Sequence, residues 1–336
     1  MPNFLFSKKF HSLIGWSISL ILLLWVGSEI DWTVLGREIL HLNYYYLLPM
    51  TAVMWLHYWV KALRWRYFLP GKCQANNMVL FDALMLGNMV SFILPLRAGE
   101  FIRPYILTRE TKYNFGTTFS SIIIERFFDL ATVLVLMAII SPMIPTLPTW
   151  AMNGAISLAV LGTCILLFIV VATYSSSPLI KIIDYCLVIL PLKFKAKIRG
   201  FLMSLIEAAG VLRGEGRLLQ VILYSILSWF LVALIFQLGL MMFGGSWSIL
   251  VGLTLTVIVA LAVAAPSAPG FIGIIQTACV ATLTLFGQTK EMALAYSLVV
   301  HVHQFIFICT VGLIILSKKQ LSLKQIQSQS NKRVAN

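Results

Sequence analysis

The chain has 336 residues, of which 60% are hydrophobic and only 11% are charged. Soluble domains are closer to about 45–50% apolar and about 25% charged, so this composition excludes an ordinary soluble fold and predicts that lipid surrounds most of the chain. The net charge is +13, but no basic face with interleaved aromatic residues is present, and we expect no nucleic-acid partner.

The apolar segments predict an all-α polytopic membrane protein with about eight transmembrane helices, because a helix needs about 20 residues to cross a hydrocarbon core of about 30 Å. Lys8 and Lys9 precede the first segment and no small-residue cleavage site follows it, so we expect an uncleaved helix rather than a signal peptide. In chain order, the expected helices are residues 12–28, 44–60, 79–96, 118–141, 152–174, 219–243, 248–265, 270–287 and 291–316.

Nearly all lysine and arginine residues fall into five segments, which are the N-terminus, 61–78, 97–117, 175–218 and the C-terminal tail. The excess of basic residues in cytoplasmic loops predicts that these segments, and with them both termini, lie on the cytoplasmic side of the plasma membrane. The nearly uncharged or acidic connections between the other helix ends then lie outside.

Because the segments on either side of 79–96 share one face of the membrane, this run is expected to enter the membrane and return rather than cross it. By the same argument, 248–287 is a hairpin entered from the other face and broken at 265–270, with arms that either cross fully or stop at mid-membrane. Broken hairpins from opposite faces are typical of secondary transporters built from inverted repeats, and we expect such an architecture here.

We expect one integral-membrane domain over residues 1–318, with a cytoplasmic basic loop at 175–218 and a disordered polar tail at 319–336. Inside the loop, Leu179–Leu192 followed by a basic cluster indicates either an interfacial amphipathic helix or an ordinary positive loop. The five cysteines are scattered, and His301 and His303 point apart on a helix. We therefore expect no metal and no cofactor.

The most informative charges are those of Glu125-Arg126-Phe127-Phe128-Asp129, which lie inside an apolar run. The three ionisable groups share one stripe of a helix, and exposure of each to lipid would cost several kcal/mol, so the stripe is expected to face the interior of the bundle. It could serve as a buried ion pair that fixes helix packing, or lie beside a substrate path.

A second segment runs from Pro95 to Arg103. Pro95 breaks the helix, and Gly99 allows a close approach of two backbones. Arg97 could pair with Glu100 three residues later, and its planar guanidinium suits a phosphate. The alternative is a capped return of the chain with an interfacial arginine.

Two further segments carry candidate residues. The break from Ser267 to Gly273 could present a helix N-terminus, which favours an anion, or could be a plain turn. The stretch Lys61–Arg66 is expected to anchor its helix at the membrane interface with Trp55, Trp59 and Trp65. A contact between Arg64 and a lipid head group is the second interpretation.

Together these segments resemble the lysylphosphatidylglycerol synthase transmembrane region, also called the flippase-like family. The resemblance spans about residues 10–317 and rests on four motifs in order: Arg64-Trp65-Arg66, Pro95–Glu100, Glu125–Asp129 and the break Ser267–Gln276. Gln276 stands where the family has an acid. The soluble aminoacyl-transferase domain of the full synthases is missing, so we expect no lysyl transfer.

The resemblance implies a protein that is not an enzyme and that moves an anionic or zwitterionic lipid, either a phospholipid or a polyprenyl-phosphate-linked lipid, between leaflets. Arginines would neutralise the phosphate and carboxylates would orient them or meet a cationic group. The candidate substrate-binding residues are Arg64, Arg97, Glu100, Arg103, Glu125, Arg126, Asp129, Ser267, Gly270 and Gln276.

Three other functions fit the sequence. A glycosyltransferase using a lipid-linked sugar would place an acidic pair in its first outer loop, here Glu29 and Asp31. A small-solute transporter would need a water-filled path. An accessory subunit without transport of its own would bind a soluble or membrane-bound lipid-modifying enzyme. The expected partners are therefore membrane lipids and possible lipid-modifying enzymes of this kind.

Overall fold

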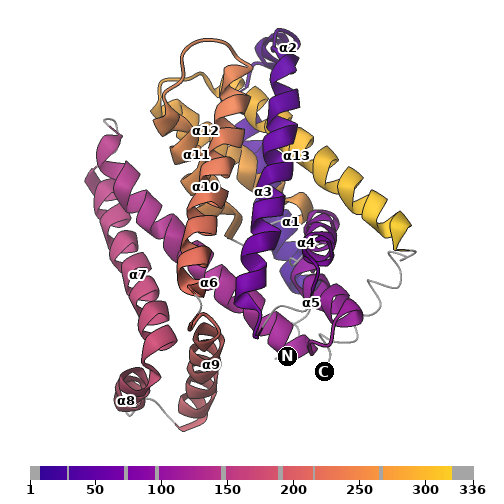
Figure 1. Cartoon of the computed structure of the whole chain (residues 1–336). Helices are drawn as coiled ribbons and strands as arrows, with labels where there is room; N and C mark the ends of the chain where they lie inside the picture. Colours follow the sequence, from indigo (N-terminus) through magenta and orange to yellow (C-terminus); the bar gives the residue numbers. More distant parts are fainter. Residues whose placement is uncertain are drawn as a thin grey trace.

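The computed structural model describes residues 8–28, 30–71, 75–94, 98–144, 149–187, 192–214, 216–264 and 268–319. This part of the chain contains thirteen α-helices joined by short turns and no β-strand (Figure 1). The helices are α1 Lys8–Gly27, α2 Trp32–Leu40, α3 Leu47–Phe68, α4 Asn77–Ile93, α5 Gly99–Glu110, α6 Phe115–Ile140, α7 Thr149–Tyr174, α8 Ser176–Cys186, α9 Leu192–Gly210, α10 Arg217–Met241, α11 Ile249–Ala264, α12 Ile274–Leu285 and α13 Lys290–Lys318.

The centre of the molecule is the antiparallel pair of α3 and α10, which pack along their whole length (Figure 1). His57 Nδ1 of α3 lies 3.2 Å from the carbonyl oxygen of Ser228 on α10. We call the end of the bundle at which α3 finishes the first end, and the end at which α3 starts the second end. Helices α6 and α13 contact this pair, and α7 packs on the other side of α6; all three run between the two ends (Figure 1).

The helices have the length and apolarity of a multi-pass membrane protein. Three of them are long and apolar enough to cross a bilayer, namely Met152–Tyr174 in α7, α10 and α13, and the pair α1–α2, bent by 93°, would make a fourth. Helices α3 and α6 have 22 and 26 residues, which is also enough length, but each carries three charged side chains. The expected number of about eight crossings therefore stays a prediction.

Helices α4 and α5 form a hairpin that starts and finishes at the first end of the bundle. The Lys319 ammonium at the end of α13 lies 3.0 Å from a carboxylate oxygen of Asp82 on α4 and 2.6 Å from one of Glu110 on α5. The two helices approach so closely that a Cβ atom on Gly99 would overlap the carbonyl oxygen of Gly87. The close approach predicted for Gly99 is thus present.

Helices α11 and α12 form the opposite hairpin, which starts and finishes at the second end. They have 16 and 12 residues, or about 24 and 18 Å at 1.5 Å per residue, less than the apolar core of about 30 Å. Their tip contains Gly270, with φ of +69°, and Phe271. Phe271 packs edge-on against Phe92 near the end of α4, with ring centroids 5.6 Å apart. The two hairpins thus meet tip to tip inside the bundle.

Residues 79–96 do not enter the bundle and return by themselves, as we expected. Asn77–Ile93 is one unbroken helix, α4, and the returning arm is α5, which lies in the segment 97–117 that we expected in the cytoplasm.

Two further expectations about helix boundaries were also wrong. Residues 61–66 do not follow a helix but belong to α3, which continues to Phe68. The basic loop does not contain one helix over Leu179–Leu192 but two, α8 and α9, and its basic cluster lies at the start of α9. In both places we expected the charged residues to mark the end of a helix. Lysine and arginine are good helix formers, however, and here they continue α3 and start α9.

We expect Gly99→Ala to destabilise the α4–α5 hairpin, because the added methyl group would overlap a backbone carbonyl that cannot rotate away. Overpacking of this kind costs about 1–3 kcal/mol, which thermal unfolding of the purified protein in detergent would measure. Gly154→Ala is the matched control, because a Cβ atom on this α7 glycine meets nothing within 4 Å. Equal melting temperatures for the two variants would contradict the packing described.

Candidate functional site

The carboxylate of Glu125 on α6 is fully buried between two arginines. One of its oxygens lies 2.8 Å from a terminal nitrogen of Arg103 on α5, and the other lies 3.3 Å from one of Arg64 on α3. The exposed fractions of the three side chains are 0%, 2% and 1%. A charge at this depth is tolerated only when it is paired, so Glu125 ties α3, α5 and α6 together.

The ion pairs continue from this core toward the surface of α6. A carboxylate oxygen of Asp129 lies 2.6 Å from the other terminal nitrogen of Arg64, and its second oxygen lies 3.5 Å from Arg126. Arg126 also lies 3.4 Å from a carboxylate oxygen of Glu100. Basic and acidic groups therefore alternate along one line, which is buried at Arg103 and about one-third exposed at Arg126.

The sequence of α3 and its neighbours fixes Arg64 in place. Arg64 donates to the hydroxyl of Ser225 on α10 at 3.1 Å. The next residue, Trp65, is fully buried and donates from its indole nitrogen to Ser121 on α6 at 2.9 Å. The guanidinium of Arg103 stacks over the Trp65 ring, 4.4 Å from its centroid. The predicted interfacial anchor is therefore wrong for Arg64 and Trp65, which lie in the core of the bundle.

A cavity of about 450 Å³ lies directly beside this line of charges. Its wall combines charged side chains from α3 and α6 with apolar side chains from α10, α11 and α12, and it reaches the tips of both hairpins at Phe92 and Phe271. The polar part of the wall consists of His57, Tyr58, Lys61, Arg64, Asn88, Arg126, Asp129, Ser228, Trp229, Thr256 and Gln304. The wall is thus amphipathic, with its basic groups gathered on one side.

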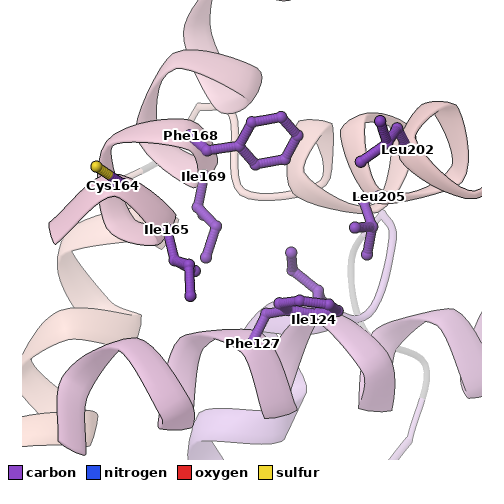
Figure 2. A pocket seen from close by; sticks show the side chains of 8 residues that line it. All are labelled: Ile124, Phe127, Cys164, Ile165, Phe168, Ile169, Leu202 and Leu205. Atoms are coloured by element: carbon purple, nitrogen blue, oxygen red, sulfur yellow. The ribbon is translucent and has the colours of Figure 1, made fainter. Parts of the chain in front are cut away.

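A second, smaller hollow of about 260 Å³ lies between α6, α7 and α9 (Figure 2). All of its described lining residues are uncharged, and all except Cys164 have aliphatic or aromatic side chains. The other lining residues are Ile124, Phe127, Ile165, Phe168, Ile169, Leu202 and Leu205. Such a wall offers nothing to a charged group, so the candidate site is the larger cavity.

The structure brings together some of the predicted site residues and separates others. Arg64, Arg126 and Asp129 line the cavity. Arg103 and Glu125 lie behind this wall as a buried ion pair, and Glu100 lies beside Arg126. The predicted residues Arg97 and Ser267 lie outside the described residues.

The remaining two predicted residues support the hairpin tip between α11 and α12. Gly270 packs against the backbone of Phe92. Gln276 is buried, accepts a hydrogen bond from the backbone N–H of Gly273 at 2.7 Å and lies 3.1 Å from His301 Nδ1. Gln276 therefore closes the first turn of α12, and the cavity wall does not include it.

Sequence reasoning missed most of the polar residues of the cavity wall, among them Lys61, Asn88 and Trp229. Lys61 precedes Arg64 by three positions and so shares its face of α3, a signal that the sequence contained. Asn88 and Trp229 lie within largely apolar helices, and only the packing of α4 and α10 around the cavity shows which way they face.

The acidic residue proposed for a glycosyltransferase has a structural role. The Oδ1 atom of Asp31 accepts hydrogen bonds from the backbone N–H groups of Thr33 at 2.8 Å and Val34 at 3.2 Å, so Asp31 caps the N-terminus of α2. Hydrogen bonds from the Thr33 hydroxyl and from these amides hold the pKa of Asp31 below its usual range. Glu29, the other member of the predicted acidic pair, lies outside the described residues.

We expect Glu125→Gln to destabilise the protein by about 3–5 kcal/mol, because it leaves the buried Arg64 and Arg103 without their shared counterion. Glu100→Gln is the matched control. Its side chain is 30% exposed, so its loss should cost no more than about 1 kcal/mol. Thermal unfolding in detergent would compare the two variants. A Glu125→Gln protein as stable as the Glu100→Gln protein would show that Glu125 does not hold the bundle together.

Comparison with known proteins agrees with this architecture. The family model of the lysylphosphatidylglycerol synthase TM region matches residues 12–312. The matched range includes every charged residue of the ion-pair line and both hairpins. No curated protein and no solved structure matches the chain. The match covers nearly the whole chain, which therefore belongs to the lysylphosphatidylglycerol synthase TM region family.

Proposed function

We propose that this protein moves a lipid with a phosphate-containing head group between the two leaflets of the membrane. The observation that carries the proposal is the cavity of about 450 Å³, with basic groups on one wall and apolar groups on the other, at the place where two short hairpins from opposite ends meet. Such a cavity can hold a charged head group while the acyl or prenyl chains stay in the bilayer.

The chemistry of the basic wall suits a phosphate. Arg126 lies at the exposed end of the ion-pair line, where its planar guanidinium can offer parallel N–H donors to two phosphate oxygens. Arg64 is held by Asp129, Glu125 and Ser225 and adds positive charge without being free to move. The carboxylates keep the cations in position and can meet a cationic group of a zwitterionic lipid.

A charged head group needs such a site because its transfer through the apolar core of the membrane has a large free-energy cost. Moving an unpaired ion from water into a medium as apolar as a hydrocarbon core has an idealised cost on the order of 20 kcal/mol. A cavity with preformed ion pairs replaces water by fixed charges and removes much of this cost. The cavity lies at the hairpin tips, and irregular backbone is tolerated within a membrane only where it is buried in protein or lines a wet space.

The arrangement of the hairpins suggests how access could alternate. One hairpin enters from the first end and the other from the second end, and their tips touch at Phe92 and Phe271. Small rotations of one hairpin against the other would open the cavity to one end while closing it to the other, as in transporters with inverted repeats. We infer such a pseudo-symmetric relation between the two hairpins.

The positions of the basic segments support an orientation in the membrane. The first end of the bundle carries the end of α3, the start of α4, the end of α5 and the C-terminal end of α13, where basic residues gather. Positively charged ends remain in the cytoplasm, so we place the first end on the cytoplasmic face of the plasma membrane, together with both termini. The second end, with α2, then faces outward.

The family supports a lipid as the substrate, because its name is that of the transmembrane region of a lysylphosphatidylglycerol synthase. We propose that this chain transports lipid and is not itself an enzyme. The role of Asp31 as a helix cap removes one argument for glycosyl transfer. An accessory subunit is the remaining alternative, and it would require a lipid-modifying enzyme as partner.

We expect Arg126→Gln to slow leaflet exchange of fluorescent phospholipids in vesicles by about 10- to 100-fold, the loss that corresponds to one charge-assisted hydrogen bond. The fluorescence protected from a membrane-impermeant quencher reports the exchange. Arg199→Gln is the matched control, because Arg199 pairs with Asp184 on α8 and lies away from the cavity. Exchange by the unaltered protein that is no faster than in protein-free vesicles would contradict the proposal.

We also expect Asp31→Asn to leave leaflet exchange unchanged, because asparagine is as good an N-cap as aspartate and α2 would keep its start. Asp31→Ala should lower the stability by about 1 kcal/mol through the lost cap. Measurement of exchange and of thermal unfolding separates these effects. Loss of function in the asparagine variant with unchanged stability would restore Asp31 as a candidate catalytic group.

A further inference from the structure

Lys61 differs from the other basic residues of the cavity. Arg64 and Arg126 each lie within 4.0 Å of two carboxylates. Lys61 lines the same cavity from α3 and is half-buried. Among the described residues, no carboxylate lies within ion-pair distance of its ammonium group. The cavity thus contains a positive charge that the described part of the protein does not neutralise by direct contact.

Two neutral hydrogen-bond donors in the same wall are also unsatisfied. The side-chain amide nitrogen Nδ2 of Asn88 on α4 and the indole nitrogen Nε1 of Trp229 on α10 are buried and have no hydrogen-bond partner in the described structure. Both residues line the cavity. Buried donors normally have an acceptor, so two of them at one cavity point to a ligand that supplies acceptor oxygens.

We propose that Lys61, Asn88 and Trp229 form the head-group site of this cavity, and that the site takes a phosphodiester with a single negative charge. The inference rests on the proposed function and names its substrate class. One ammonium group matches one negative charge, and the two neutral donors bind the non-bridging oxygens without adding charge. The apolar wall, from Val259 and Ile275 among others, receives the first methylene groups of the lipid.

The same wall disfavours other head groups. A phosphomonoester carries about −1.5 to −2 charges at pH 7, and the additional charge would face the carboxylate of Asp129 on the cavity wall. A head group with a net positive charge would be repelled by Lys61. Singly charged phosphodiesters occur both in phosphatidylglycerol-type glycerophospholipids and in polyprenyl phosphates carrying one sugar, and the test includes both sources.

Binding can be measured without transport. The purified full-length protein in detergent is titrated with dihexanoyl phosphatidylglycerol, dihexanoyl phosphatidic acid, dihexanoyl phosphatidylcholine and a farnesyl phosphosugar. The signal is the tryptophan fluorescence that disappears in Trp229→Phe. We expect saturable binding of the phosphatidylglycerol, the phosphosugar or both, and weaker binding of the phosphatidic acid and the phosphatidylcholine.

Lys61→Gln should weaken binding of the phosphodiester by about 10- to 100-fold, and Lys61→Arg should restore most of it. Arg66→Gln is the matched control, because Arg66 lies on the same helix but is exposed and donates to Asn77 away from the cavity. Lys61→Met should also raise the melting temperature of the ligand-free protein, since it removes a charge that has no close counterion.

Equal affinities for the Lys61→Gln and unaltered proteins, or tighter binding of the phosphatidic acid, would overturn the inference. If binding depends on Lys61 but the protein gives no leaflet exchange in vesicles, the head-group site is supported and the transport proposal is refuted. If the protein gives leaflet exchange that Lys61→Gln does not change, the transport proposal is supported and the head-group site is refuted. The two proposals can thus fail separately.

Discussion

The buried carboxylate of Glu125 is the constraint on which the rest of the structure depends. It lies inside an apolar run of α6, where a lone charge would be strongly destabilising. Two arginines from different helices compensate it, and they in turn are held by Asp129, Ser225 and the Trp65 ring. These ion pairs therefore favour the register in which α3, α5 and α6 pack. The same requirement brings further charges to the surface of α6, where they become the wall of a cavity.

The hairpins explain why a cavity exists at that place. Helices α4, α5, α11 and α12 are shorter than the long helices around them, and they approach each other from opposite ends. Where their tips meet, the chain cannot fill the space as evenly as continuous helices would. The space is lined by charged side chains of α3 and α6 and by apolar side chains of α10, α11 and α12, so its wall is amphipathic. An amphiphilic ligand matches this combination, whereas a purely apolar one fits the hollow between α6, α7 and α9 (Figure 2).

Much of the fold could be predicted because hydrophobic length and the positions of Pro and Gly are local signals. Most long helices begin and end within a few residues of the expected boundaries, although α3 continues to Phe68, and the second hairpin breaks where Pro and Gly predicted it. The first hairpin was expected within 79–96, but its returning arm is α5, whose residues were expected in the cytoplasm. The position of charged residues within a bundle is not local. Arg64 was expected at the membrane interface because it follows an apolar run, yet Glu125 and Asp129 draw it into the core. Its burial requires knowledge of a partner about 60 positions away.

The candidate site shows the same limit more sharply. The sequence identified Arg126 and Asp129 because charges inside an apolar helix are unusual, and it missed Lys61 because a lysine near a helix end is ordinary. Only the cavity shows that this lysine shares a wall with unpartnered hydrogen-bond donors, Asn88 on α4 and Trp229 on α10. The roles of Gln276 and Asp31 as helix caps were also invisible in the sequence, because both were judged by their chemistry and not by their place at a helix start.

The most direct test of the account is an experimental structure of the protein in lipid nanodiscs that contain phosphatidylglycerol. The account predicts a phosphate in the cavity, within hydrogen-bond distance of Lys61 and near Arg126, with its acyl chains leaving toward the bilayer. A cavity closed by its own side chains, or lipid head groups bound only at the two ends of the bundle, would contradict it.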